Sequence, residues 1–132
     1  VWAGGLEGLY RFDAEGPQQV GAGEGFRSGW VTALLPDGES LLIGTYAGGV
    51  FILPEGSIVP APGLEEPWVP PGGLHRARGC VWIGCLGRPA QRWYETCLSS
   101  LSVPAAYVHA VAEGPGRGLL LLTSEGLLRT AD

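Results

Sequence analysis

The chain has 132 residues, of which 45% are hydrophobic and 16% are charged, a balance typical of a globular protein rather than a disordered one. Its net charge of −5 argues against a nucleic-acid partner, because phosphate binding requires a basic surface. The sequence shows neither the roughly 20 consecutive apolar residues of a transmembrane helix nor a signal peptide.

Glycine and proline are the compositional outliers. The chain contains 23 Gly and 11 Pro, and these residues separate short apolar runs instead of forming one low-complexity tract. Short apolar runs bounded by turn formers are typical of an all-β protein with many strands. No apolar pattern with a helical period competes with this interpretation.

Four similar apolar runs follow one another along the chain. They occupy residues 1–5, 41–45, 81–85 and 119–123, so their starts are 40, 40 and 38 residues apart. A repeat of about 40 residues is the period of one blade in well-known β-propellers. The sequence therefore predicts an all-β, repeat-built architecture.

Each run is embedded in the same sequence of elements. A short turn, usually with Gly, leads to a second strand at 8–12, 49–53, 90–94 and 126–130, which predicts hairpins. A preceding strand is expected at 30–34, 68–72 and 107–111, the middle one an edge or irregular strand because of Pro70 and Pro71. Weak fourth strands are expected at 18–22, 57–61 and 96–101.

These elements predict a partial β-propeller of about three to four four-stranded blades. The blades span approximately 1–29 (lacking its first strand), 30–67, 68–106 and 107–132 (lacking its last strand). Since complete propellers close 4–8 blades into a ring, we expect the remaining blades in the same or another chain. A sandwich or open barrel of irregular strands stays as the alternative fold.

The motifs within these strands carry a resemblance to a known family. Leu42-Ile43-Gly44-Thr45 and Trp82-Ile83-Gly84-Cys85 represent the apolar run of the repeat. Val31-Thr32-Ala33-Leu34, before the run at 41–45, and Val108-His109-Ala110-Val111, before the run at 119–123, represent the element that precedes it. This pattern resembles the two-component regulator propeller repeats. The third repeat departs from it at Arg88-Pro89 and the fourth at Leu122.

The resemblance implies a role in bacterial signal transduction. Such repeats build sensor propellers outside the cytoplasm, often in front of a membrane helix and a histidine kinase or cyclase. It therefore implies a periplasmic or extracellular location. The chain itself contains no kinase motif.

No catalytic, metal or cofactor site is predicted. The two histidines, His75 and His109, are 34 residues apart and belong to no ligand motif, and no nucleophile elbow is present. Cys80, Cys85 and Cys97 match no zinc spacing, which favours buried thiols, although a Cys85–Cys97 bridge stays open.

One group of residues is a candidate binding surface. Trp30, Trp68 and Tyr107 each directly precede a first strand, and Tyr46 and Arg88 lie in turns expected on the same face. His109 is expected beside the central channel, either as a wall residue or with a role as a ligand or in proton transfer. Aromatic faces with polar tips are typical of carbohydrate, peptide or small-molecule sites, but they also serve as packing between blades.

The sequence therefore predicts a non-catalytic propeller segment that binds a ligand or a protein. Two alternatives stay open: a fragment of a propeller-scaffold glycosidase or lyase, and a purely structural interaction module. An enzyme requires converging carboxylates or a histidine cluster near the axis, a binder requires aromatic and hydrogen-bonding groups there, and a structural module requires an apolar patch on an outer edge.

Overall fold

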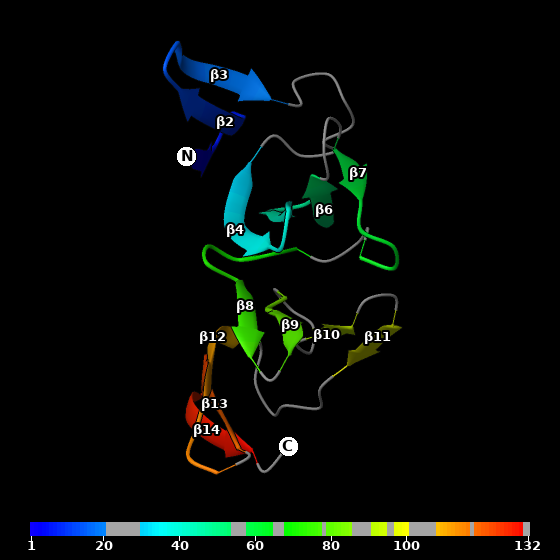
Figure 1. Ribbon diagram of the computed structural model, residues 1–132. Helices are drawn as coiled ribbons and strands as arrows, with labels where there is room; N and C mark the ends of the chain where they lie inside the picture. The colour runs from blue at the N-terminus through cyan, green and yellow to red at the C-terminus, as the bar shows by residue number, and fades with distance from the viewer. Residues whose placement is uncertain are drawn as a thin grey trace.

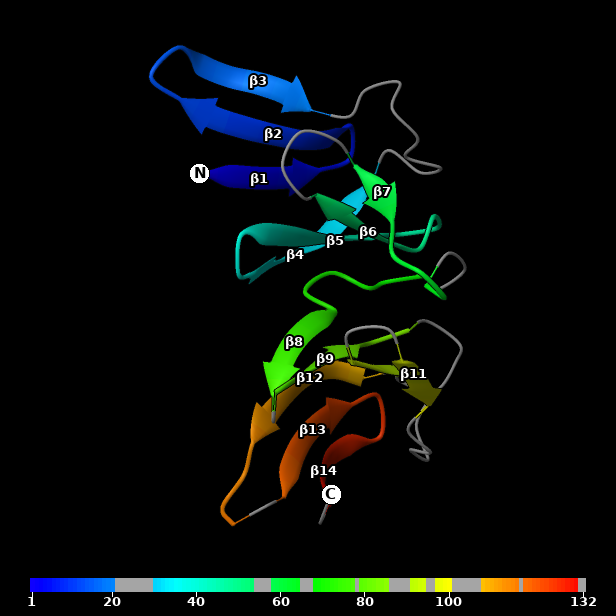
Figure 2. The same ribbon diagram turned by 45° about the vertical axis from the view of Figure 1, so that its right-hand side comes forward.

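The fold consists of four antiparallel β-sheets that follow one another in chain order (Figures 1 and 2). The structure, a computed structural model, describes residues 1–20, 30–53, 58–64, 68–77, 79–85, 91–94, 97–100, 108–116 and 118–130. Within these residues every regular element is a strand and none is a helix. The expected all-β class is confirmed.

Each sheet is a meander in which strands adjacent in sequence are also adjacent in space. The first sheet contains β1 (Trp2–Gly5), β2 (Gly8–Asp13) and β3 (Gly16–Val20), and the second contains β4 (Val31–Asp37), β5 (Ser40–Thr45), β6 (Val50–Leu53) and β7 (Val59–Pro60). The third contains β8 (Leu74–Ala77), β9 (Cys80–Ile83), β10 (Gln91–Tyr94) and β11 (Cys97–Ser100), and the fourth contains β12 (Val108–Glu113), β13 (Leu119–Thr123) and β14 (Gly126–Thr130).

The four repeated apolar runs form the equivalent strands β1, β5, β9 and β13, and each is paired with the strand that follows it. The expected fourth strands occur as β3, β7 and β11, of which β7 has only two residues. The division into blades at 29, 67 and 106 stays a prediction, since the boundary regions fall on residues outside the described ranges.

The first strand of the third sheet differs from its expected position at 68–72. It is β8, which begins only at Leu74. Gly73 N donates to Pro70 O at 2.9 Å, and Gly72 has φ of 68°. Pro71 followed by a glycine with positive φ is typical of a type II turn, which ends the extended backbone there. The two prolines therefore delay the strand rather than make it irregular.

Two of the sheets share a detailed local geometry. The β4–β5 register shifts between Val31 and Ala33, and the β12–β13 register shifts at the corresponding place, between Val108 and Ala110. A buried threonine ends both β5 and β13. Its Oγ1 donates to a carbonyl across the following turn at 2.8 Å, from Thr45 to Gly49 and from Thr123 to Gly126. These common features identify the sheets as copies of one structural unit.

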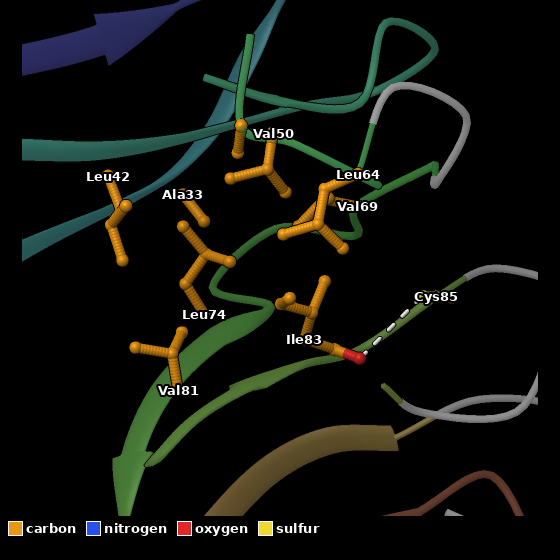
Figure 3. Packing of buried hydrophobic residues seen from close by; sticks show 10 residues of the cluster. Ala33, Leu42, Val50, Leu64, Val69, Leu74, Val81, Ile83 and Cys85 are labelled. Carbon is orange, nitrogen blue, oxygen red and sulfur yellow. Dashed lines mark hydrogen bonds between the residues drawn. The ribbon is translucent and has the colours of Figure 1, made fainter. Parts of the chain in front are cut away.

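Three clusters of buried side chains lie at the three junctions between successive sheets. Side chains alternate between the two faces of a strand, so β5 directs Leu41 and Ile43 toward the first sheet and Leu42 toward the third. This explains why the run is apolar at every position. Figure 3 shows the middle junction, where Val50 and Leu64 meet Val69, Leu74 and Ile83.

A glycine recurs in three of the four apolar runs, at positions 4, 44 and 84, and marks a close approach between neighbouring sheets. A Cβ atom built on Gly44 would lie 2.8 Å from Val69 Cγ1, whereas one on Gly4 would overlap the side chain of Val31. On Gly84 it would overlap the carbonyl oxygen of Val108. Each junction thus lacks room for a side chain at this position, which is the physical reason for the repeated glycine.

Candidate functional site

Three of the predicted site residues form one aromatic cluster at the junction of the second and third sheets. The rings of Trp30 and Tyr46 stack with their centroids 4.5 Å apart and their planes inclined by 22°. Tyr46 and Trp68 have centroids 5.5 Å apart and an interplanar angle of 40°. The structure therefore brings together residues that are 38 positions apart in the sequence.

Backbone pairing positions the first two rings. Val31 lies opposite Thr45 in the β4–β5 ladder, and the pairing extends one step further because Tyr46 N donates to Trp30 O at 3.0 Å. Residues opposite each other on antiparallel strands have neighbouring side chains. The stacked pair is therefore a direct consequence of the strand register.

The third ring is positioned by contacts between the two sheets. Val69 N donates to Thr45 O at 3.0 Å, and Thr32 Oγ1 donates to Val69 O at 2.7 Å. Gly72 N in turn donates to Thr32 O at 2.9 Å. These bonds fix the segment that carries Trp68 against the second sheet, and the small Gly44 makes the approach sterically feasible.

The cluster presents one open aromatic surface rather than a slot. A ring-to-ring distance of 4.5 Å is direct van der Waals stacking and leaves no room for a ligand between Trp30 and Tyr46. Both of these side chains are half-buried, whereas Trp68 is 48% exposed. Trp68 is therefore the most exposed of the three rings.

Sequence reasoning missed Thr45 as a positioning residue for this cluster. Its buried hydroxyl donates to Gly49 O at 2.8 Å and accepts from Gly48 N at 3.0 Å, which fixes the turn after Tyr46. The repetition of threonine at position 123, where the same two kinds of bond occur, is the sequence signal that points to it.

Of the other three predicted residues, His109 alone belongs to the described part of the chain. Tyr107 and Arg88 lie outside the described residues. His109 is exposed on β12, at the junction of the third and fourth sheets. Its carbonyl oxygen accepts a hydrogen bond from His75 Nε2 at 3.0 Å, so this histidine backbone ties the two sheets together.

An ion pair that no sequence pattern predicted also bridges two sheets. Arg76 on β8 contacts Asp37 on β4 through Nη2 and Oδ1. The partners are 39 residues apart, and both side chains are two-fifths exposed. The pair connects β4 and β8, the first strands of the second and third sheets. Asp37 ends β4, whereas the stacked rings lie at the start of that strand.

Among the described residues, no three His, Cys, Asp or Glu side chains are grouped as metal ligands would be. Cys80 and Cys85 are buried thiols, and Cys85 Sγ donates to Ile83 O at 3.6 Å (Figure 3). The side chain of Cys97, the other candidate for a bridge, lies outside the description. The described part of the chain also has no helix suited to cross a membrane.

Comparison with known proteins finds a likeness in structure alone. No protein-family model and no curated protein matches the chain. A solved structure does match: the extracellular domain of a protein described as a hybrid two-component system of B. thetaiotaomicron, with a TM-score of 0.64 and 19% identity over 96% of the chain. The chain spans about one fifth of that structure, 20% of its length. At this identity the likeness concerns the fold.

Proposed function

We propose that this chain is an arc of a β-propeller that binds a ligand or a protein without catalysing a reaction. In this proposal, each described sheet is one blade, complete or in part, of a ring that contains further blades. The exposed face of Trp68, at the end of a fixed aromatic stack, is the contact surface. The two-component regulator repeats remain the family that the sequence motifs favour.

The repeated junctions support the propeller. Three successive pairs of sheets pack in the same way. In each pair, the glycine of the apolar run in one sheet lies against a valine at or just before the start of the first strand of the next sheet. Such repetition gives each sheet the same relation to its neighbour, which is how a propeller arises. The likeness in fold to a much longer extracellular domain agrees with an arc that is part of something larger.

The arrangement of the aromatic cluster supports binding. An aromatic ring whose orientation is already fixed loses little conformational entropy when a ligand covers it. Trp68 combines such fixation, through the bonds of Val69, with a half-exposed apolar face. Flat apolar groups fit this face best, and a sugar ring, a proline or an aromatic side chain of a peptide supplies one.

A sensory role outside the cytoplasm is the wider context that we propose. The neighbour in the solved structures is an extracellular domain of a signalling protein, and the sequence motifs resemble those of sensor propellers. Ligand binding at Trp68 would then alter the packing between the second and third sheets, because the same segment makes the contacts between them.

Binding is tested by calorimetric titration of the intact protein with neutral oligosaccharides and with peptides rich in proline and aromatic residues. We expect at least one binder, and we expect Trp68→Ala to weaken it by about tenfold or more, as for a central aromatic contact. Leu6→Ala is the control, since Leu6 is an apolar residue exposed by 71% that lies in the turn between β1 and β2 and not on a sheet face.

The proposal is wrong if Trp68→Ala leaves the affinity of every binder unchanged. Loss of binding by both variants would indicate a general effect on folding instead. A purely structural module is the second candidate, because apolar side chains are exposed on the outer faces of the described sheets, Phe12 on the first and Leu127 on the fourth. For such a module the titrations of the unaltered protein with oligosaccharides and peptides show no binding.

A further inference from the structure

Two leucines are exposed on the outer face of the fourth sheet, which Arg129 of β14 shares, and no described residue covers them. Leu121 packs into the junction with the third sheet and Leu128 against it, so their neighbours Leu122 and Leu127 point to the opposite face. These two residues lie directly opposite each other on β13 and β14. Their exposed fractions are 48% and 68%, which are high for leucines in a strand.

The strand register shows which residue of the second sheet corresponds to Leu122. Leu122 pairs with Ala110 just after the shift in β12, and Gly44 pairs with Ala33 just after the same shift in β4. The residue that follows is in each case the buried threonine, Thr123 or Thr45. Leu122 therefore occupies the position that is glycine in the other three sheets.

The corresponding face of each preceding sheet is covered by the next sheet. Val50, which lies opposite Gly44 as Leu127 lies opposite Leu122, is almost fully buried. It belongs to the buried cluster that also contains Leu74 and Ile83 of the third sheet. Continuity of the repeat thus indicates that a sheet also covers Leu122 and Leu127.

A covering sheet cannot approach the fourth sheet as closely as the others approach their neighbours. At the other junctions even a single Cβ atom in place of the glycine hydrogen would come within 2.8 Å of Val69 Cγ1 or overlap Val31 or Val108. A leucine adds four carbon atoms there. Its side chain therefore has to occupy space that the first residue of the next inner strand fills elsewhere.

We propose that a further antiparallel sheet packs on Leu122 and Leu127 at a wider spacing than the sheets within the described chain, with Leu122 filling the gap. This inference rests on the proposed propeller arc and specifies one of its junctions. The partner is an apolar sheet face of the same repeat type, since that is what covers the equivalent positions of the other three sheets. The wider junction distinguishes this place from all others in the described repeat.

Coverage is tested by thiol labelling of the intact protein. L122C and L127C are treated with a maleimide and the extent of labelling at each site is measured by peptide mass spectrometry. Leu6→Cys is the matched control, because Leu6 is an exposed leucine in the turn between β1 and β2. We expect both outer-face thiols to react about tenfold more slowly than the control thiol, because a packed sheet must open before the reagent enters.

The wider spacing is tested by Leu122→Ala in the same protein. If Leu122 fills a gap, its truncation leaves a cavity and lowers the Tm by several degrees, whereas Leu6→Ala leaves the Tm unchanged. If the junction has the usual close spacing, Leu122 is strained there, so Leu122→Ala raises the Tm or leaves it unchanged.

The outcomes separate the inference from the proposed function. Slow labelling together with a lowered Tm supports the wide junction. Slow labelling with an unchanged or raised Tm overturns the wide junction but leaves the propeller arc intact. Labelling of L122C and L127C as fast as the control overturns both the junction and the continuation of the arc.

Discussion

The second sheet and the first sheet carry similar apolar residues at equivalent positions but bury them differently. Phe51 and Leu53 on β6 are buried against the first sheet, whereas Phe12, which corresponds to Leu53 in the repeat, is 45% exposed on β2. Burial in this protein therefore depends on whether a neighbouring sheet is present, and not on the strand alone. The repeat supplies the apolar face, and the junction supplies the stability.

The largest effect is expected where one side chain is central to a junction. Ile83 is fully buried between the second and third sheets, so Ile83→Ala removes packing from both and should lower the free energy of unfolding by about 2–5 kcal/mol. Leu6→Ala, at an exposed turn, should change it by less than about 0.5 kcal/mol. Urea unfolding measures both, and equal effects would contradict the central role of the junction.

The next effect concerns the close approach at glycine. Gly44→Ala places a Cβ atom 2.8 Å from Val69 Cγ1 and 3.3 Å from Ala33 Cβ, which should destabilise the protein by about 1–3 kcal/mol through overpacking. Gly5→Ala is the matched control, because nothing lies within 4 Å of a Cβ atom on Gly5. If Gly44→Ala leaves the Tm unchanged, the second and third sheets can move apart by enough to accommodate a Cβ atom without loss of stability.

A smaller effect compares the two repeated threonines. Thr45→Val leaves the amide of Gly48 without its acceptor and removes one of the two hydrogen bonds to the carbonyl of Gly49, which keeps the bond from Thr45 N. It should cost about 1–3 kcal/mol. Thr123→Val removes the equivalent bonds in a less buried setting and should cost less. Chemical denaturation ranks the two, and the reverse order would contradict the link between burial and cost.

The smallest effect on stability is expected for the ion pair between β4 and β8. Asp37 and Arg76 are both substantially exposed, so Asp37→Asn should lower stability by no more than about 1 kcal/mol, and less at high salt. A double-mutant cycle with Arg76→Gln isolates the pair. A coupling energy well above that value would show that this ion pair contributes more to the packing of β4 against β8 than its exposure suggests.

Much of the fold was predictable from sequence because the repeat is expressed in short-range patterns. The 40-residue spacing and the glycine-bounded hairpins located most strands, since turn chemistry and alternation act over a few residues. The predicted position of β8, at 68–72, was wrong. Pro70 and Pro71 were interpreted as interruptions within a strand, whereas they belong to a turn that precedes it. That distinction depends on which amides find partners in the next sheet.

The candidate site was predictable only in part. The recurrence of aromatic residues at 30 and 68 identified both as candidates. It predicted neither their stacking with Tyr46 nor that Trp68 is the most exposed of the three rings. Tyr107 and Arg88 lie outside the described residues, so their part in the site stays a prediction. The supporting contacts, such as Thr32 to Val69, join residues 37 positions apart and leave no local trace in the sequence.

The sequence by itself determined that this protein is built of repeated, glycine-punctuated antiparallel strands, because strand and turn preferences are local properties. Only the tertiary structure decided that the recurring glycine, which Leu122 replaces in the fourth repeat, is the contact point between sheets. It also decided which of the aromatic residues meet. The physical reason is that close packing is a property of two surfaces at once, and one strand's sequence describes only one of them.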